Sequence, residues 1–195
     1  MEDLGNALAR ARDGDPEGVA ELYRVYAGPL LAFLITQVRR REDAEDLLGE
    51  VFLSAMRDLN KFEGDVGGFR AWLYRIATNR AVDLARRNAR RPEEPLATAI
   101  ERPGPSDPAS EALGRVDRER LWRAVMALPK AQRQVVGMRL AGGLSAPEIA
   151  EALGKPVGAV KALQHRALVN LTKAFEAPYP GGPERRLKGR EENLD

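Results

Sequence analysis

The sequence predicts an all-α protein made of two small helical domains joined by a proline-rich linker. Several segments carry apolar residues at the three- and four-residue spacing of an amphipathic helix, and no run shows the apolar–polar alternation of a β-strand. Five of the thirteen prolines lie between residues 89 and 113, where no apolar period is sustained. Because proline fixes φ and removes a backbone donor, we expect a flexible, acidic linker at residues 91–116. The two domains then occupy residues 1–90 and 117–176, followed by a disordered tail at 177–195.

The composition excludes several classes of protein. Hydrophobic residues make up 44% of the 195 and charged residues 31%, which is ordinary usage for a folded chain. The absence of cysteine excludes disulfides, thiolate metal sites and cysteine nucleophiles, and one histidine leaves little for zinc chemistry. The N-terminus lacks the apolar stretch of a signal peptide, and nowhere do about 18 apolar residues run together. We therefore expect a cytoplasmic protein with no membrane insertion, no metal site and no cofactor.

Three amphipathic helices are predicted in the first domain. The first follows Asp15, a good N-cap residue, with Pro16 suited to its first position, and extends to about Arg39. The second, EDAEDLLGEVFLSAMRDL, has a continuous apolar stripe and an acidic opposite face. After the loop KFEGDVGG, the third runs from Phe69 to Arg91 with most of its arginines outside the apolar stripe.

The second domain contains a helix-turn-helix pattern. In LSAPEIAEALGKPVGAVKALQHRALVNLTKAF, Ser145 and Glu148 have the spacing of a capping box, which predicts a short helix through Leu153. Gly154 suits the left-handed position that ends such a helix, and a longer helix starts about three residues later. The expected apolar face of this longer helix consists of Val157, Val160, Leu163, Ala167, Leu168 and Leu171.

Charge is distributed unevenly along the chain. Residues 66–91 and 120–176 each carry a net charge of +6, whereas residues 92–119 carry −4. Solvated helices that happen to cluster like charges would explain either basic block alone. Two basic blocks, both on helical patterns, favour two contacts with a polyanion.

The helix-turn-helix predicts a DNA-reading surface, because the second helix of this motif enters the major groove. Its outward residues able to meet bases or phosphates are Lys161, Ala162, Gln164, His165 and Arg166. The alternative is a helical hairpin with a solvated basic face. In the basic helix of the first domain, the spacing of Trp72 with Phe69 and Ile76 predicts burial, whereas Tyr74 is predicted to face solvent.

Catalysis finds little support in these motifs. The segment GDVGG lacks the Lys-Ser/Thr of a phosphate-binding loop and is expected to be a flexible loop. The acidic residues between 42 and 50 have no histidine partner and no metal-ligand set, so a solvated face is the better interpretation. We expect no catalytic residue.

These segments, in this order, resemble the extracytoplasmic-function subfamily of bacterial RNA polymerase sigma factors. That subfamily is a compact branch of the sigma-70 family with only the second and fourth conserved regions. The resemblance covers about residues 15–90 and 117–175. Similar to the core-binding and promoter-melting helices of region two are ELYRVYAGPLLAFL, EDAEDLLGEVFLSAM and GGFRAWLYRIATNRAVDLARR. Similar to the helix-turn-helix of region four is ALPKAQRQVVGMRLAGGLSAPEIAEALGKPVGAVKALQHRAL.

The resemblance implies three groups of site residues. Docking on the clamp helices of the largest polymerase subunit is implied for Asp43, Asp46, Leu47, Glu50 and Phe52. Capture and opening of the minus-ten promoter element are implied for Phe62, Asp65, Arg70, Tyr74, Arg75, Asn79, Arg80, Arg86 and Arg87. Recognition of the minus-35 element is implied for Lys161, Ala162, Gln164, His165 and Arg166. The implied partners are core RNA polymerase, promoter DNA and an anti-sigma factor.

The sequence departs from the family pattern at a few positions. Gly49 stands where the family usually has Gln, and Pro156, Ala159 and Ala162 replace hydroxyl residues common near the start of the recognition helix. Fewer polar contacts are therefore expected there. A larger share of the DNA contacts is then expected from Lys161, Gln164, His165 and Arg166.

Two alternatives to a sigma factor follow from the residues. A stand-alone operator-binding regulator would bind duplex DNA specifically without polymerase. A magnesium-dependent nucleic-acid-processing enzyme would use the acidic residues 42–50 and would reveal itself by turnover.

Overall fold

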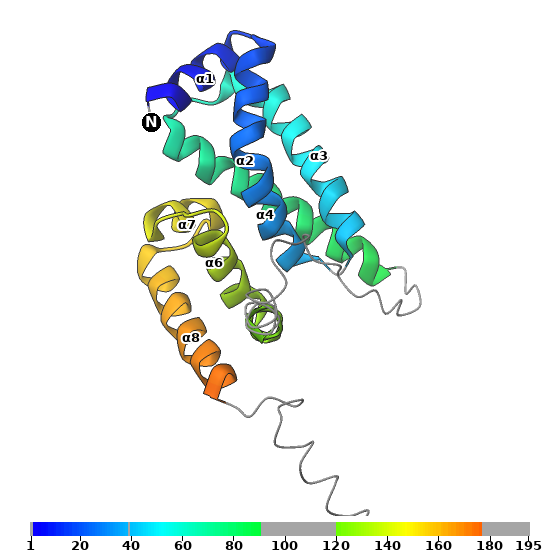
Figure 1. Ribbon diagram of the computed structural model, residues 1–195, viewed down its shortest axis with the longest axis vertical. Coiled ribbons are helices and arrows are strands. Elements are labelled where there is room, and N and C mark those ends of the chain that lie inside the picture. Colours follow the sequence, from blue (N-terminus) through cyan, green and yellow to red (C-terminus); the bar gives the residue numbers. More distant parts are fainter. Residues whose placement is uncertain (1, 39, 91–119, 177–195) are drawn as a thin grey trace, which may run out of the picture.

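Every regular element is a helix in the computed structural model, which describes residues 2–38, 40–90 and 120–176. The first group of helices comprises α1 (Glu2–Arg12), α2 (Pro16–Gln37), α3 (Arg41–Asp58), the 3-10 turn η1 (Leu59–Lys61) and α4 (Val66–Arg90) (Figure 1). The second group comprises the helical residues 120–127, α6 (Lys130–Leu140), α7 (Ala146–Leu153) and α8 (Val157–Glu176). The all-α prediction is confirmed. The expected linker at 91–116 and tail at 177–195 lie outside the described residues.

Local capping signals decide where several helices begin and end. The Asp15 carboxylate accepts a hydrogen bond from the Glu17 amide at 2.9 Å, with Pro16 following in the first turn of α2. At α7 the Ser145 side chain and Glu148 form the reciprocal bonds of a capping box. Gly154 ends α7 with a φ of 60°, the left-handed conformation that glycine adopts without strain. All three predicted caps are confirmed.

Helix α2 lies at the centre of the apolar core. Its Leu22, Leu30, Phe33 and Leu34 are completely buried. With 22 residues and a mean hydropathy of 1.3, α2 also has the length and apolar character of a membrane-spanning helix. About a third of this apolar stretch is buried, where α2 packs against α1, α3, α4 and α6.

Helix α1 is an element that the sequence reasoning did not predict. Its apolar stripe is short and built partly from small residues, of which Ala7, Leu8 and Ala11 are buried. Alanine allows α1 and α2 to approach closely, and Gly18 of α2 lies at the contact. A Cβ added at Gly18 would be 2.6 Å from the Ala11 nitrogen and 2.7 Å from the Ala7 oxygen. Backbone therefore packs directly on backbone at this point.

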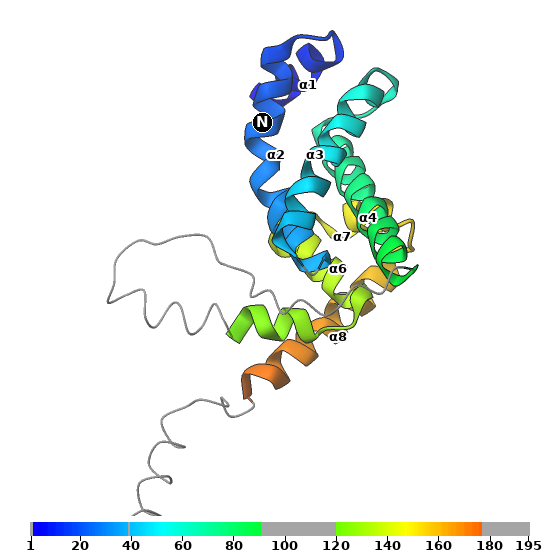
Figure 2. The same ribbon diagram turned by 90° about the vertical axis from the view of Figure 1, so that its right-hand side faces the viewer.

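The two groups of helices pack against one another, with α7 against α4 and α6 against α2. Figures 1 and 2 show α6 and α7 lying alongside the helices of the first group. One apolar core runs through both groups, since Met138, Leu144 and Ile149 join the buried residues of α2 and α4. A smaller core, confined to the second group, contains Val125, Leu128, Val136 and Ala167.

Two details of the predicted elements are wrong. The expected flexible loop at GDVGG, residues 64–68, is partly helical, because α4 begins within it at Val66. The helix begins early because the Asp65 carboxylate accepts a hydrogen bond from the Gly68 amide at 2.8 Å. In α8, Val157 and Leu168 are 37% and 63% exposed, so the buried face is narrower than predicted.

Substituting Gly18 tests the close approach of α1 and α2. Alanine favours a helix over glycine by about 1 kcal/mol, yet at Gly18 the added methyl group meets backbone atoms that must move. We expect Gly18→Ala to lower the free energy of unfolding by about 1–3 kcal/mol in thermal denaturation followed by circular dichroism. Gly28→Ala is the matched control on the same helix, because a Cβ there meets nothing within 4 Å. An equal or higher stability for Gly18→Ala would contradict the described contact.

Candidate nucleic-acid interface

The helix-turn-helix of the second group presents a basic outer face on α8. The exposed residues Lys161 and His165 are one turn apart, and beside them the exposed Ala162 and Arg166 form a second row. The Arg166 Nε donates a hydrogen bond to the Ala162 carbonyl at 3.3 Å, so its side chain follows the helix surface. The opposite face is anchored by Val160 and Ala167, which are completely buried. This face carries two cations, a histidine and a small apolar side chain, which can contact phosphates or base edges in a groove.

Gln164 is the predicted reading residue that lies apart from this face. It is half-buried and lines an apolar groove between α6, α7 and α8. The exposed Leu140 and Leu168 line the same groove. The structure therefore groups four of the five predicted residues and leaves Gln164 at the edge.

Helix α4 presents a second basic surface, made of two adjacent rows of side chains. Arg75, Asn79 and Arg86 are exposed and lie on one side of the helix at spacings of four and seven residues. Arg80 and Arg87 form the neighbouring row. The Arg80 guanidinium lies 4.0 Å from the Glu50 carboxylate of α3, whereas Arg86 is paired with Asp83 on its own helix. Five predicted minus-ten residues thus lie in two rows along α4, with the exposed Asp83 between the rows.

Tyr74 and Arg70 do not belong to this open surface. The prediction that Tyr74 faces solvent is wrong, because its side chain is only 1% exposed. The ring packs at 5.1 Å from the Phe33 ring, and the turn between α6 and α7 covers its hydroxyl group. Burial raises the pKa of the phenol above its ordinary value. Helical periodicity shows that Tyr74 lies outside the main apolar stripe of α4. It does not show that the second group of helices covers this part of α4.

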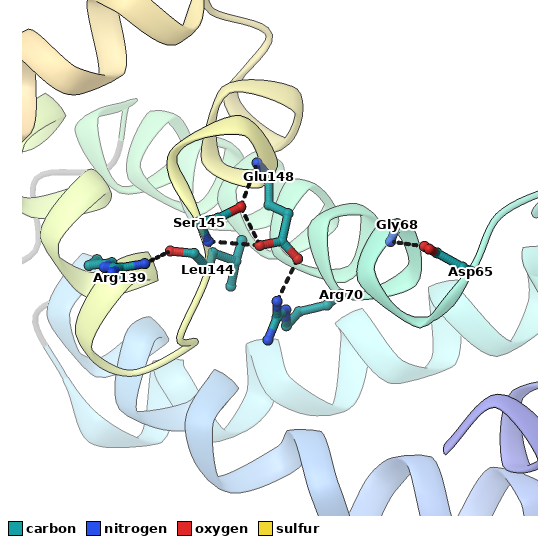
Figure 3. A network of polar contacts seen from close by, with 7 residues as sticks. All are labelled: Asp65, Gly68, Arg70, Arg139, Leu144, Ser145 and Glu148. Carbon is teal, nitrogen blue, oxygen red and sulfur yellow. Dashed lines mark hydrogen bonds and ion pairs between the residues drawn. The ribbon is translucent and has the colours of Figure 1, made fainter. Parts of the chain in front are cut away.

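Arg70 is held in a polar network that joins the two groups of helices (Figure 3). Its guanidinium donates to Glu148 Oε1 at 2.5 Å, while Glu148 Oε2 accepts from the Ser145 amide at 2.7 Å. We call this contact between α4 and α7, together with the packing of α6 on α2, the seam. Burial alone would raise the pKa of Glu148, but hydrogen bonds from Ser145 and Arg70 outweigh it and hold this pKa below its ordinary value of 4.5. One carboxylate thus caps α7 and binds a cation of the first group.

The segment before α4 places Phe62 and Asp65 differently. The Phe62 ring is partly buried and stacks on Trp72, with 5.0 Å between centroids and 16° between planes. Trp72, which was predicted to be buried, is half-buried and packs against the apolar core. Asp65 is exposed and holds the first turn of α4. The Phe62 ring thus packs inward on α4, whereas Asp65 faces solvent.

Helix α3 carries an acidic face, although two of its five predicted docking residues lie beneath the surface. Leu47 and Phe52 are 2% and 6% exposed, so they support this face from below and do not form it. Asp46 and Glu50 are exposed, and Asp43 is half-buried.

Sequence reasoning missed one residue on this face. Leu53 is 75% exposed and shares a stripe with Asp46 and Glu50 at spacings of four and three residues. A large apolar side chain outside the apolar stripe of α3 is the signal that would have found it. Tyr23 of α2, 47% exposed, extends the apolar part of this face, with its ring 4.7 Å from that of Phe52. We call Asp46, Glu50 and Leu53 the docking stripe.

Residues 2–38, 40–90 and 120–176 contain no group of three or more His, Cys, Asp or Glu side chains placed to hold a metal ion. Among the acidic side chains of residues 42–50, Glu42, Glu45 and Glu50 lie within 4.0 Å of an arginine nitrogen. This arrangement gives no support to the magnesium-dependent enzyme considered above.

Comparison with known protein families supports the two-part reading of the chain. Residues 22–91 match the family Sigma-70 region 2, and residues 118–171 match Sigma-70, region 4. The first matched range holds α3 and α4, and the second holds the helix-turn-helix. A stand-alone operator-binding regulator is not favoured, because both sigma regions are present in order.

Two characterised relatives and one solved structure are similar to the chain. The ECF RNA polymerase sigma factor BldN of Streptomyces coelicolor is 34% identical over 171 residues, which span 85% of this chain and 63% of BldN. The ECF RNA polymerase sigma-E factor of Escherichia coli is 33% identical over 169 residues, which span 82% of this chain and 87% of that protein.

The solved structure shares the fold. It is the sigma factor RpoE in complex with the anti-sigma factor NepR from Bartonella quintana, with a TM-score of 0.64, 22% identity and coverage of 82% of this chain and 98% of that one. The matched regions and the identity over most of the sigma-E factor show that this chain belongs to the extracytoplasmic-function sigma factors of RNA polymerase, within the sigma-70 family.

Proposed function

We propose that the chain directs RNA polymerase to promoters by supplying DNA contacts at two separate elements, and that it performs no chemistry itself. The observation that carries this proposal is the pair of basic faces on α4 and α8, each within a matched sigma region. A polyanion held at two points by one chain gains affinity, since the second contact forms at high effective concentration. In this proposal the catalytic site belongs to the polymerase. Because the chain acts together with that enzyme, we propose that it works in the cytoplasm.

Region two contributes both docking and strand capture in this account. The docking stripe of Asp46, Glu50 and Leu53 contacts the clamp helices of the largest polymerase subunit. Its two carboxylates supply charge at the rim of the contact, and Leu53 supplies an apolar side chain that the contact buries. On the neighbouring helix, the rows of Arg75 and Arg80 hold the phosphates of the minus-ten element. Binding the unpaired strand more tightly than the duplex shifts the melting equilibrium toward open DNA.

Region four contributes a duplex anchor. Lys161, His165 and Arg166 enter the major groove of the minus-35 element, with Ala162 available to contact a thymine methyl group. An anti-sigma factor is the further partner we propose, because a solved sigma factor of similar fold was determined with one.

Simultaneous binding to both elements requires the seam to open. The two elements are centred about 25 base pairs apart, or roughly 85 Å along the duplex at about 3.4 Å per base pair. A compact body built from the described residues 2–38, 40–90 and 120–176 has a radius of gyration of only about 15 Å. Because one apolar core joins the two groups of helices, the described arrangement is too short to reach both elements. We infer that it is the form of the free chain and that polymerase and promoter hold the groups apart.

Reconstituted transcription with core polymerase and a promoter library tests the proposed function. We expect initiation from a selected set of promoters only when the chain is added. Failure of the chain to co-elute with core polymerase, or initiation without promoter selection, would contradict the proposal.

Removing single cations from α8 tests the minus-35 assignment. We expect Lys161→Ala and Arg166→Ala each to weaken promoter-specific transcription. Each phosphate contact that is lost should reduce the slope of log affinity against log salt by about one. Lys173→Ala, on the last turn of α8, is the control and should keep the wild-type slope. Unchanged salt dependence in both variants would place the duplex elsewhere.

Removing the acidic groups of the docking stripe tests the polymerase contact. Asp46→Ala combined with Glu50→Ala should weaken retention of the chain by immobilised core polymerase while leaving the circular dichroism spectrum unchanged, since both side chains are exposed. Glu45→Ala is the matched acidic control, because Glu45 pairs with Arg41 outside the stripe. Wild-type retention of the double variant would count against this docking face.

Weakening the seam should increase DNA binding by the free chain. A Cβ at Gly137 of α6 would lie 3.0 Å from Phe33 and 3.1 Å from the Thr36 hydroxyl, so Gly137→Ala crowds the seam while favouring α6 itself. Glu148→Gln keeps a capping-box residue but removes the charge that binds Arg70. Both variants should bind a minus-35 plus minus-ten duplex several-fold more tightly in fluorescence anisotropy, whereas Gly28→Ala should not.

Lowering the pH should weaken the seam as Glu148→Gln does, because protonation also removes the negative charge that binds Arg70. The pKa of Glu148 in the folded chain lies below its ordinary value, so its contribution is complete above about pH 4.5 and is lost as the pH falls through the lowered pKa. Equal affinity of wild type and both seam variants near neutral pH would show that closure does not limit DNA binding.

A further inference from the structure

Helix α1 lies outside both matched sigma regions, yet its last residue contacts the segment that precedes α4. The Arg12 Nη2 donates a hydrogen bond to the Gly64 carbonyl at 2.5 Å, across 52 positions of the chain. The centre of the same guanidinium lies 5.3 Å from the centroid of the Phe62 ring. One side chain therefore contacts both the backbone and the aromatic ring of this segment.

The segment is folded tightly around the Phe62 ring. That ring stacks on Trp72 and meets Phe69 edge-on, with 5.9 Å between centroids. A Cβ at Gly64 would lie 2.6 Å from the Phe62 Cζ, so the backbone at Gly64 passes directly over the edge of the ring. Trp72, Gly64 and Arg12 together surround Phe62. The ring supports the segment from inside, while Glu63, Gly64 and Asp65 face solvent.

Arginine is the residue type that this contact requires. Its planar guanidinium donates hydrogen bonds in the plane and attracts an aromatic ring, whereas a lysine ammonium is a compact point charge. The Arg12 Nε is buried and has no hydrogen-bond partner within residues 2–38, 40–90 and 120–176. One nitrogen of the guanidinium therefore gives up solvation while Nη2 holds the Gly64 carbonyl.

We propose that Arg12 is a positioning residue for recognition of the unpaired minus-ten strand. It fixes the segment from Phe62 to Asp65 in the shape that meets an extruded base, without contacting the DNA itself. Because α1 packs closely on α2 at Gly18, Arg12 at the end of α1 lies beside this segment. The inference rests on the proposed function, and its test separates the two.

The test measures how holoenzyme discriminates between two fluorescent single-stranded oligonucleotides. One carries the nontemplate minus-ten segment of a promoter selected in the transcription assay, and the other carries the same segment scrambled. We expect Arg12→Met to lower the ratio of the two affinities by about tenfold, the order expected for loss of a charged hydrogen bond. Arg12→Lys should restore part of the ratio, because it keeps a cationic donor but not the planar group. Gly18→Ala should also lower the ratio by undocking α1.

Two controls make the result specific to Arg12. Arg10→Met removes a cation from the same helix, where Arg10 pairs with Asp15 at 2.6 Å and does not contact the segment, so the ratio should stay at the wild-type value. Binding of a minus-35 duplex by the Arg12→Met holoenzyme should also be unchanged. A wild-type ratio for Arg12→Met, or an equal loss for Arg10→Met, would overturn the inference. Absence of discrimination in the unsubstituted holoenzyme would overturn the proposed function and this inference with it.

Discussion

Phe69, Leu73 and Ala77 are completely buried where α4 packs against α2 and α3, and this packing orients every other residue of the helix. Each large side chain buried there stabilises the fold by about 1.5–3 kcal/mol relative to exposure. With that face fixed inward, the arginine rows must face outward and Tyr74 must face the second group. The burial of α4 therefore determines where the basic surface, the seam and the segment held by Arg12 lie.

The seam combines strong apolar packing with imperfect polar contacts. Ile149 and Leu144 are completely buried in the core that both groups share. Beside them, Tyr74 Oη and Arg70 Nε are buried without a hydrogen-bond partner in the described part of the chain. A buried polar group left unpaired costs about 1–3 kcal/mol, which offsets part of the apolar gain. An interface with such opposing contributions can hold the free chain closed and still yield to the larger surfaces of polymerase and DNA.

Sequence reasoning succeeded where the determining contacts are local. The caps at Asp15 and Gly154 depend on neighbouring residues alone, and the charged faces follow from helical periodicity. It failed where the contacts join distant segments. Nothing near Tyr74 in sequence indicates that the turn between α6 and α7 covers it, and α1 is stable because it docks on α2. Leu53 was predictable, because it is an apolar residue outside the stripe of its own helix.

The proposed function requires one chain, closed when free, to span two promoter elements by parting its two groups of helices. Because the chain has no cysteine, single cysteines introduced at the exposed positions Ala20 and Lys173 would carry two labels uniquely. The distance between these labels should have one narrow distribution in the free chain, because the closed packing of the two groups fixes it. It should increase by several tens of ångströms in the complex with core polymerase and promoter DNA. An unchanged distance in that complex would contradict the account.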